Sequence, residues 1–169
     1  MIDMHAAAPV PVSEYLNTRY RPDYDYIDGR LLERNVGELD HSRLQGLVSC
    51  YLANRETQWG IFVTLGPRIR ITETRFRVPD IVVITGRLPS SPILTEPPFL
   101  CVEILSQHDQ RSEMRDRVKD YLSFGVPYVW LIDARTRRAH IHSSAGIRAA
   151  RGVLTTENPD IRVVLSELE

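Results

Sequence analysis

Two strand-like apolar runs each contain one acidic residue, and this combination constrains the fold more than any other feature of the chain. The first run is 77–84 and contains Asp80, and the second is 99–105 and contains Glu103. Both have the continuous apolar character of strands that are buried on both faces. A carboxylate in such a strand pays a large desolvation cost when it ionises. Each acid therefore needs a cation, a polar partner or an opening to water.

Two acids on neighbouring core strands predict a metal site. A hard divalent cation prefers oxygen ligands and would neutralise Asp80 and Glu103 together. The alternative is that each acid lies at a solvated strand end or pairs with an arginine. The residues alone leave both interpretations open.

The length of 169 residues predicts one domain with a substantial core. We expect a flexible N-terminus over 1–10 and a single domain over 11–169. The formal net charge of −1 argues against a uniformly basic nucleic-acid-binding surface, although a local basic patch is compatible with it. The sequence has no apolar run long enough to span a membrane, and the first ten residues include Asp3 and lack the basic region of a secretory signal. Cys50 and Cys101 both lie in apolar segments, which favours a cytoplasmic protein with buried thiols.

Local patterns predict the elements of the N-terminal half. A helix is expected over 12–20 with Ser13 as N-cap, followed by a β-hairpin around Asp28-Gly29, a dipeptide typical of tight turns. A second helix is expected to begin at Asp40. Glu33, at the end of the hairpin, is a candidate third acid of the site, and the alternative is a solvated strand end.

His41 and Gln45 lie one turn apart on the second helix and therefore share a face, which could line a cleft. On the strands that follow, Arg68 and Arg70 are expected to project from one face of the sheet. Arg75 and Arg77 extend this positive charge toward Asp80. As a group these arginines could bind phosphate, whereas a solvated sheet face is the alternative for each one alone.

The C-terminal half follows a strand, helix, strand pattern. Residues 86–98 contain four prolines and read as a loop, and a helix with Asp109 as N-cap is expected to end at Gly125. Its apolar stripe comprises Met114, Val118, Tyr121 and Leu122. The order from Leu100 to Ile132 predicts parallel strands joined by a right-handed crossover. The segment 135–138 is a basic turn between the strands 128–132 and 139–142.

Three segments taken in order resemble a known nuclease superfamily. They are Pro79-Asp80, Glu103-Ile104-Leu105-Ser106 and the stretch 125–133. Together they resemble the PD-(D/E)XK nucleases, and more narrowly the Uma-two type of restriction endonuclease, from about Tyr15 to the C-terminus.

This resemblance implies an α/β fold with a restriction-endonuclease-like mixed β-sheet flanked by α-helices and an N-terminal β-hairpin. It also implies that Asp80 and Glu103 bind Mg²⁺, with Mn²⁺ as a substitute, and that the Ile104 carbonyl is a further ligand.

The chain departs from the superfamily at a catalytic lysine. The position two residues after the glutamate, where that lysine often lies, is Leu105. In the branch that this chain resembles, the lysine lies on the following helix, four residues before a tyrosine, which is the place of Arg117. Arginine stays charged and binds phosphate, but it is a poor proton acceptor. Arg117 therefore puts turnover in question more than binding, while helix geometry places Lys119 toward solvent.

Three functions are compatible with the sequence. The first is a metal-dependent endonuclease acting on DNA, in which His41, Gln45, Arg68 and Arg70 contact the substrate and a homodimer matches the two-fold symmetry of duplex DNA. The second is a catalytically weakened nuclease-fold protein that binds nucleic acid or a protein partner. The third is a hydrolase of another class whose two carboxylates act as acid and base. Metal dependence separates the first from the third, and turnover separates the first from the second.

Overall fold

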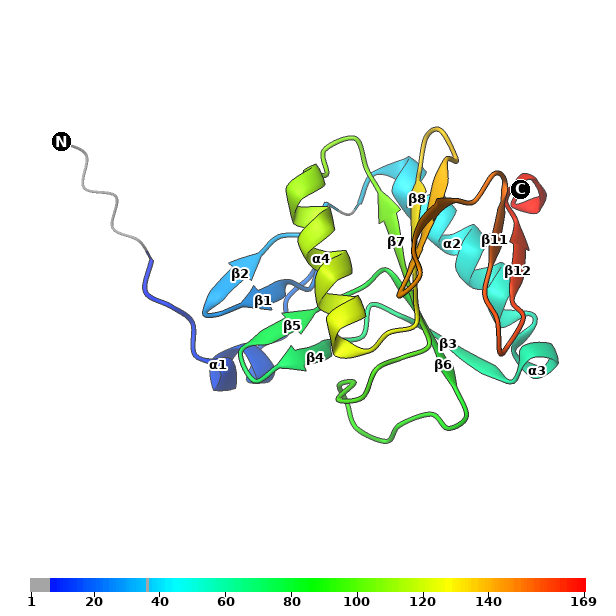
Figure 1. Cartoon of the computed structure of the whole chain (residues 1–169). Coiled ribbons are helices and arrows are strands. Elements are labelled where there is room, and N and C mark those ends of the chain that lie inside the picture. Colours follow the sequence, from blue (N-terminus) through cyan, green and yellow to red (C-terminus); the bar gives the residue numbers. More distant parts are fainter. Residues whose placement is uncertain (1–6, 36) are drawn as a thin grey trace.

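The computed structural model describes residues 7–35 and 37–169. Its strands form a six-stranded mixed sheet, a four-stranded antiparallel sheet and a two-stranded ribbon (Figure 1). The ribbon pairs β11 (Val153–Thr155) with β12 (Arg162–Val164) and precedes the short 3-10 helix η1 (Leu165–Glu167).

The six-stranded sheet has the order β10-β9-β8-β7-β6-β3. Its strands are β3 (Ile61–Leu65), β6 (Ile81–Thr85), β7 (Leu100–Leu105), β8 (Tyr128–Asp133), β9 (Ala139–Ser143) and β10 (Gly146–Ala149). Only β7 and β8 pair in parallel, and the helix α4 (Arg111–Phe124) connects them. The predicted strand, helix, strand unit is therefore confirmed. The helix ends as expected at Gly125, whose φ of 108° is the left-handed conformation that glycine adopts readily.

Both faces of the central strands β6 and β7 are buried, because α2 (Leu39–Ala53) covers one face and α4 the other (Figure 1). Alternation along β6 sends Ile81 and Val83 to the α2 side and Val82 and Ile84 to the α4 side. Two apolar faces explain why the sequence of these strands is apolar at every position rather than at every second one. The short helix α3 (Glu56–Trp59) leads from α2 into β3.

The four-stranded sheet has the order β2-β1-β5-β4 and lies beside the first sheet. Its elements are β1 (Asp25–Ile27), β2 (Arg30–Leu32), β4 (Ile69–Thr72) and β5 (Arg75–Arg77), with α1 (Val12–Asn17) packed nearby. The predicted hairpin is confirmed, since Asp28 and Gly29 both have positive φ (48° and 91°), as its tight turn requires. The first helix is shorter than the expected 12–20, because Thr18 is already extended.

The apolar run 77–84 is not one strand. β5 ends at Arg77 in one sheet and β6 begins at Ile81 in the other, so Val78, Pro79 and Asp80 cross between the two sheets. Pro79 has no N–H to donate to a strand ladder, which suits this break. Asp80 consequently lies at the junction of the sheets, immediately before its strand begins.

Three smaller expectations need correction or qualification. The predicted N-caps Ser13, Asp40 and Asp109 are wrong, because the helices follow Pro11, Glu38 and Gln110, none of which makes a side-chain capping bond. Cys101 is buried, but Cys50 lies on the exposed side of α2. Of the expected flexible segment 1–10, residues 1–6 lie outside the described residues, while the Val10 N–H donates to the Gly29 carbonyl (2.9 Å). None of the described helices is long and apolar enough to cross a membrane.

A buried ion network joins the four-stranded sheet to α4. The Arg77 side chain is 2% exposed and donates to Asp25 (3.0 Å) and to Asp120 of α4 (2.7 Å). Arg75 also donates to Asp120 (2.6 Å), and the Val78 N–H donates to Asp25 (2.9 Å). Ion pairs as well as apolar contacts therefore hold the four-stranded sheet against α4.

Replacing Arg77 tests this network. The substitution Arg77→Ala leaves two buried carboxylates without their main cation, so we expect the free energy of unfolding to fall by about 3 to 5 kcal/mol. Urea denaturation followed by circular dichroism measures this loss. Arg30→Ala, on the exposed part of β2, is the matched control and should change stability by less than ~0.5 kcal/mol. Equal effects of the two substitutions would show that the network does not stabilise the junction.

Candidate active site

The structure brings the Asp80 and Glu103 side chains to one pocket. The antiparallel register of β6 and β7 pairs Ile81 with Val102, and continuing it by one residue sets Asp80 opposite Glu103. Alternation along β7 places Glu103 on the α4 side of the sheet, whereas Asp80 lies just before β6 and is not placed by alternation. They line a cavity of about 10 Å³, whose wall also includes Arg34, His41 and Arg117. Polar and charged side chains therefore make up most of the wall around the two acids, together with Ile104 and Met114.

Asp80 is held by polar contacts from three elements. One carboxylate oxygen accepts from Arg34 Nη2 (2.5 Å), and the other contacts His41 Nε2 (3.2 Å) and accepts from the Ile104 N–H (2.7 Å). Gln45 donates to the Asp80 backbone carbonyl (2.9 Å). His41 and Gln45 thus share the face of α2 that the sequence predicts. Both contact Asp80 itself.

These contacts determine how Asp80 ionises. Burial opposes ionisation, but the hydrogen bond from His41 and the positive charge of Arg34 outweigh it, so the pKa of Asp80 lies below its ordinary value. Burial also opposes protonation of His41, yet the Asp80 carboxylate raises the pKa of His41 above its ordinary value. Asp80 is therefore a fully compensated anion.

Glu103 is compensated less completely. Two residues of α4 contact its Oε1. The Tyr121 hydroxyl donates a hydrogen bond to it (2.6 Å), and Arg117 Nε lies 3.4 Å from it. Arg117 Nη2 is directed elsewhere, to Asp25 (3.2 Å) and the Val78 carbonyl (3.0 Å). Burial raises the pKa of Glu103 to about 7, because Arg117 offsets it only in part and the Asp80 charge adds to it.

The donor set fits a hard divalent cation. Two carboxylates and the backbone of Ile104 line one pocket, and the raised pKa of Glu103 is that of a buried acid lacking a sufficient counter-charge. Within the described part of the chain, no group of three or more His, Cys, Asp and Glu side chains is arranged to bind a metal. The protein would therefore supply two carboxylates and one carbonyl, with water completing the coordination. Because Arg34 occupies one oxygen of Asp80, an incoming cation would compete with it.

Three other predicted residues lie elsewhere. Glu33 is exposed and does not line the pocket, because β2 ends at Leu32 and strand alternation does not continue to it. Arg68 uses four of its five N–H donors on Asp23 and on the carbonyls of Tyr15 and Thr18, so it anchors the α1 region. Arg70 lies on β4, partly exposed. The arginines 68, 75 and 77 are engaged by acids and do not form a free phosphate-binding row.

Sequence reasoning missed two residues at the pocket. Arg34 is the direct partner of Asp80, and Asp109 lines the same cavity while accepting from the Ser106 N–H (2.6 Å) and from Asn35 (2.9 Å). The only available signal for Arg34 was the general rule that a buried acid pairs with an arginine. His108, which follows β7 in the sequence, does not line the pocket; it is exposed and contacts Glu38 (3.1 Å).

The structure is thus a mixed α/β fold in which Asp80, just before β6, and Glu103, within β7, line one pocket. A family model described as "Putative restriction endonuclease" (Uma2) matches residues 12–168, and the chain belongs to this family. Among solved structures, it resembles "a putative nuclease belonging to DUF820" from Anabaena variabilis, with a TM-score of 0.81 and 18% identity, over 95% of this chain and 97% of that one. The nuclease-like fold predicted from the sequence is therefore confirmed. No curated protein matches the chain.

The raised pKa of Glu103 predicts a pH-dependent stability. The folded protein binds a proton at Glu103 more tightly than the unfolded chain, whose pKa is near the ordinary 4.5. Proton binding at Glu103 therefore adds to the free energy of unfolding, by a few kcal/mol as an order of magnitude. The addition is fully present below about pH 4.5 and is lost as the pH rises through about 7. Glu103→Gln keeps an acceptor for Tyr121 but cannot ionise, so its stability should lack the pH dependence that comes from Glu103.

The measurement is urea denaturation of both proteins between pH 4.5 and 8 with a chelator present. We expect the wild type to lose stability relative to Glu103→Gln as the pH rises. Parallel curves would mean that Glu103 ionises normally in the folded protein.

Proposed function

We propose that this protein is a metal-dependent endonuclease that hydrolyses phosphodiester bonds in DNA through a PD-(D/E)XK-like site. The observation that carries the proposal is the meeting of Asp80 and Glu103 in one buried pocket of a chain from this family. The similarity to a structure described as a nuclease supports it.

Asp80, Glu103 and the Ile104 carbonyl would hold Mg²⁺ or Mn²⁺. When bound, such an ion neutralises charge on the scissile phosphate and lowers the pKa of an attacking water. His41 and Gln45 fix the position of Asp80, and the Tyr121 hydroxyl orients Glu103. Arg117 cannot accept a proton, so its role is to hold Glu103 and to offset negative charge.

A catalytically weakened, binding-only protein is the second candidate. It is favoured by the position of Arg117, which is 4% exposed and directed toward Glu103, Asp25 and the Val78 carbonyl. A guanidinium held in this way supplies charge without proton transfer. Binding of DNA without turnover would identify this second function.

The DNA partner and a homodimer belong to the same proposal. The homodimer rests on analogy with the two-fold symmetry of duplex DNA. Sedimentation equilibrium distinguishes one chain of 19.4 kDa from two.

Cleavage assays test the nuclease function directly. Plasmid, linear and single-stranded DNA are incubated with Mg²⁺ or Mn²⁺, and products are resolved on gels. Asp80→Asn and Glu103→Gln should each lower the cleavage rate at least ~100-fold, because each removes an anionic ligand of the cation. Glu33→Gln, at an exposed acid outside the pocket, is the matched control and should cleave like the wild type. Undiminished cleavage by Asp80→Asn would show that the activity does not come from this site.

The contact between Arg34 and Asp80 predicts an effect on metal affinity. Arg34 is a tethered cation on the carboxylate that the metal needs, so Arg34→Ala should tighten Mn²⁺ binding by roughly 10-fold, equivalent to about 1.4 kcal/mol. Isothermal titration calorimetry with Mn²⁺ measures this without DNA. Arg43→Ala, at an exposed position of α2, should leave the affinity unchanged. Weaker binding by Arg34→Ala would show that Arg34 assists the cation instead of competing with it.

A further inference from the structure

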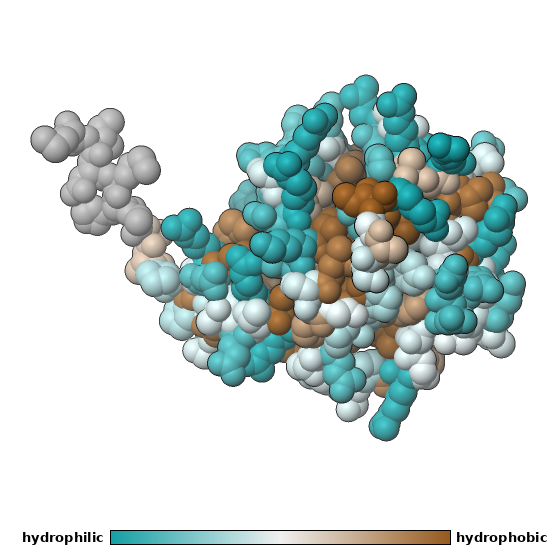
Figure 2. All heavy atoms as spheres, viewed as in Figure 1, coloured by the Kyte–Doolittle hydropathy of each residue, from teal (hydrophilic) through white to brown (hydrophobic). Residues whose placement is uncertain are grey.

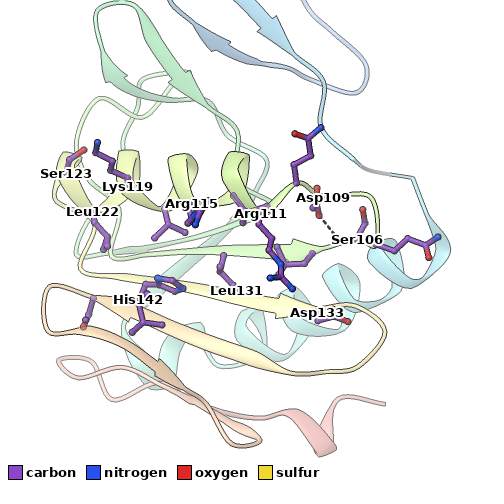
Figure 3. Close-up of a pocket in the computed structure, with 18 residues that line it drawn as sticks. Ser106, Asp109, Arg111, Arg115, Lys119, Leu122, Ser123, Leu131, Asp133 and His142 are labelled. Atoms are coloured by element: carbon purple, nitrogen blue, oxygen red, sulfur yellow. Dashed lines mark hydrogen bonds between the residues drawn. The ribbon is translucent and has the colours of Figure 1, made fainter.

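A much larger hollow adjoins the carboxylate pocket. This groove, of about 1000 Å³, lies between α4 and the strands β8, β9 and β10 (Figure 3). Asp109 and Met114 line both the groove and the carboxylate pocket, so the two hollows share a wall. In the space-filling view, an apolar strip is visible between the polar surface of α4 and the neighbouring hairpin (Figure 2).

One wall of the groove carries a row of cations. Arg111, Arg115 and Lys119 are exposed and follow one another at four-residue steps on α4, each step advancing roughly 6 Å along the helix (Figure 3). None of the three forms an ion pair with another residue of the described ranges. These charges are therefore available to an external anion, and their spacing suits a ligand with several negative groups in line.

The acids of the groove are satisfied by the protein itself. Asp109 accepts from the Ser106 N–H and from Asn35, as described for the pocket. Asp133 accepts from the backbone N–H groups of Arg135 (2.9 Å) and Thr136 (2.7 Å), and although its slight burial favours the neutral form, these bonds hold its pKa below the ordinary value. These bonds do not remove the charge of the acids, so the lining carries three cations against two acids and its formal charge is only slightly positive.

The floor of the groove is aliphatic. Leu122 and Leu131 line it from α4 and β8, and Ile147 lies on the edge strand β10 with 68% of its surface exposed. A ligand that fits must therefore combine regularly spaced anions with apolar faces. A single strand of nucleic acid has both, because its unpaired bases are free to pack on side chains. An intact duplex presents phosphates and sugars outward and would leave this floor uncovered.

We infer that the groove binds single-stranded DNA, with phosphates along Arg111, Arg115 and Lys119 and bases against Leu122, Leu131 and Ile147. A strand held there would lie next to the Asp80 and Glu103 pocket, across the wall formed by Asp109 and Met114. The inference deepens the proposed function by specifying the form of DNA that its site receives. Binding in the groove does not itself require cleavage.

Fluorescence anisotropy with a labelled oligonucleotide tests the inference. Single-stranded DNA and the duplex of the same sequence are titrated with the full chain in the presence of EDTA, which separates binding from cleavage. The single strand should bind more tightly. The double substitution Arg115→Gln and Lys119→Gln should lower the slope of log affinity against log salt by about 1.4, that is about 0.7 for each lost contact. Arg43→Gln on the exposed side of α2 should leave the slope unchanged.

The apolar floor is tested by Ile147→Asp, which should weaken single-strand binding at least ~5-fold. Leu65→Asp is the matched control, because Leu65 is 59% exposed on β3, at the opposite edge of the same sheet. Circular dichroism melting shows whether each variant remains folded. Equal affinity for the single strand and the duplex would overturn the inference, and so would wild-type binding by both groove variants.

Failure of the groove and failure of the nuclease proposal give different results. If Asp80→Asn abolishes cleavage while Ile147→Asp binds and cleaves like the wild type, the groove inference is wrong and the nuclease stands. If no DNA is cleaved, but Ile147→Asp loses single-strand binding while Leu65→Asp keeps it, the groove inference stands and the nuclease proposal is wrong.

Discussion

The structure depends on compensating several carboxylates that are buried where two sheets meet. Asp25, Asp80 and Glu103 are each almost inaccessible to solvent, and ionising any of them in such a place is costly without a partner. Arginines from distant parts of the chain supply the positive charge, with Arg77 on Asp25 and Arg34 on Asp80. The junction is therefore an electrostatic structure as much as an apolar one.

Asp80 and Glu103 differ in how well their negative charges are compensated, and this difference characterises the candidate site. Asp80 has a cation, a histidine and a backbone donor, whereas Glu103 has a hydroxyl and a more distant guanidinium. The same helix supports both the site and the neighbouring groove. Its buried face carries Arg117 and Tyr121 to Glu103, and its exposed face carries the basic row that begins at Arg111. The proposed metal-dependent nuclease would use the acids to bind a cation and the basic row to bind the substrate.

Local patterns in the sequence predicted most of the fold. Apolar runs identified β6 and β7, and Asp28-Gly29 identified the hairpin, since both signals depend on neighbouring residues alone. The sequence also predicted that Asp80 and Glu103 lie on neighbouring strands and that His41 and Gln45 share a face of α2. It did not predict that His41 contacts Asp80. The resemblance to a nuclease family supplied the mixed sheet and the position of Arg117.

Features that depend on distant partners could not be predicted in this way. Arg68 follows a strand period that suggests a free basic face, but Asp23, 45 positions away, engages it. Arg34 lies after the end of β2, where alternation no longer determines direction, and its partner is 46 positions away. The apolar pattern of 77–84 predicts one strand, although the chain passes from one sheet to the other at Pro79. In each case the controlling contact is tertiary, and no periodicity encodes it.

The central claim is that Asp80 and Glu103 share one divalent cation. A crystal soaked with Mn²⁺ and measured for anomalous scattering tests it most directly. We predict a peak at roughly 2.0 to 2.5 Å from oxygens of both carboxylates, with the Ile104 carbonyl beside it. Absence of a peak at this pocket, or a peak that contacts other residues only, would contradict the account.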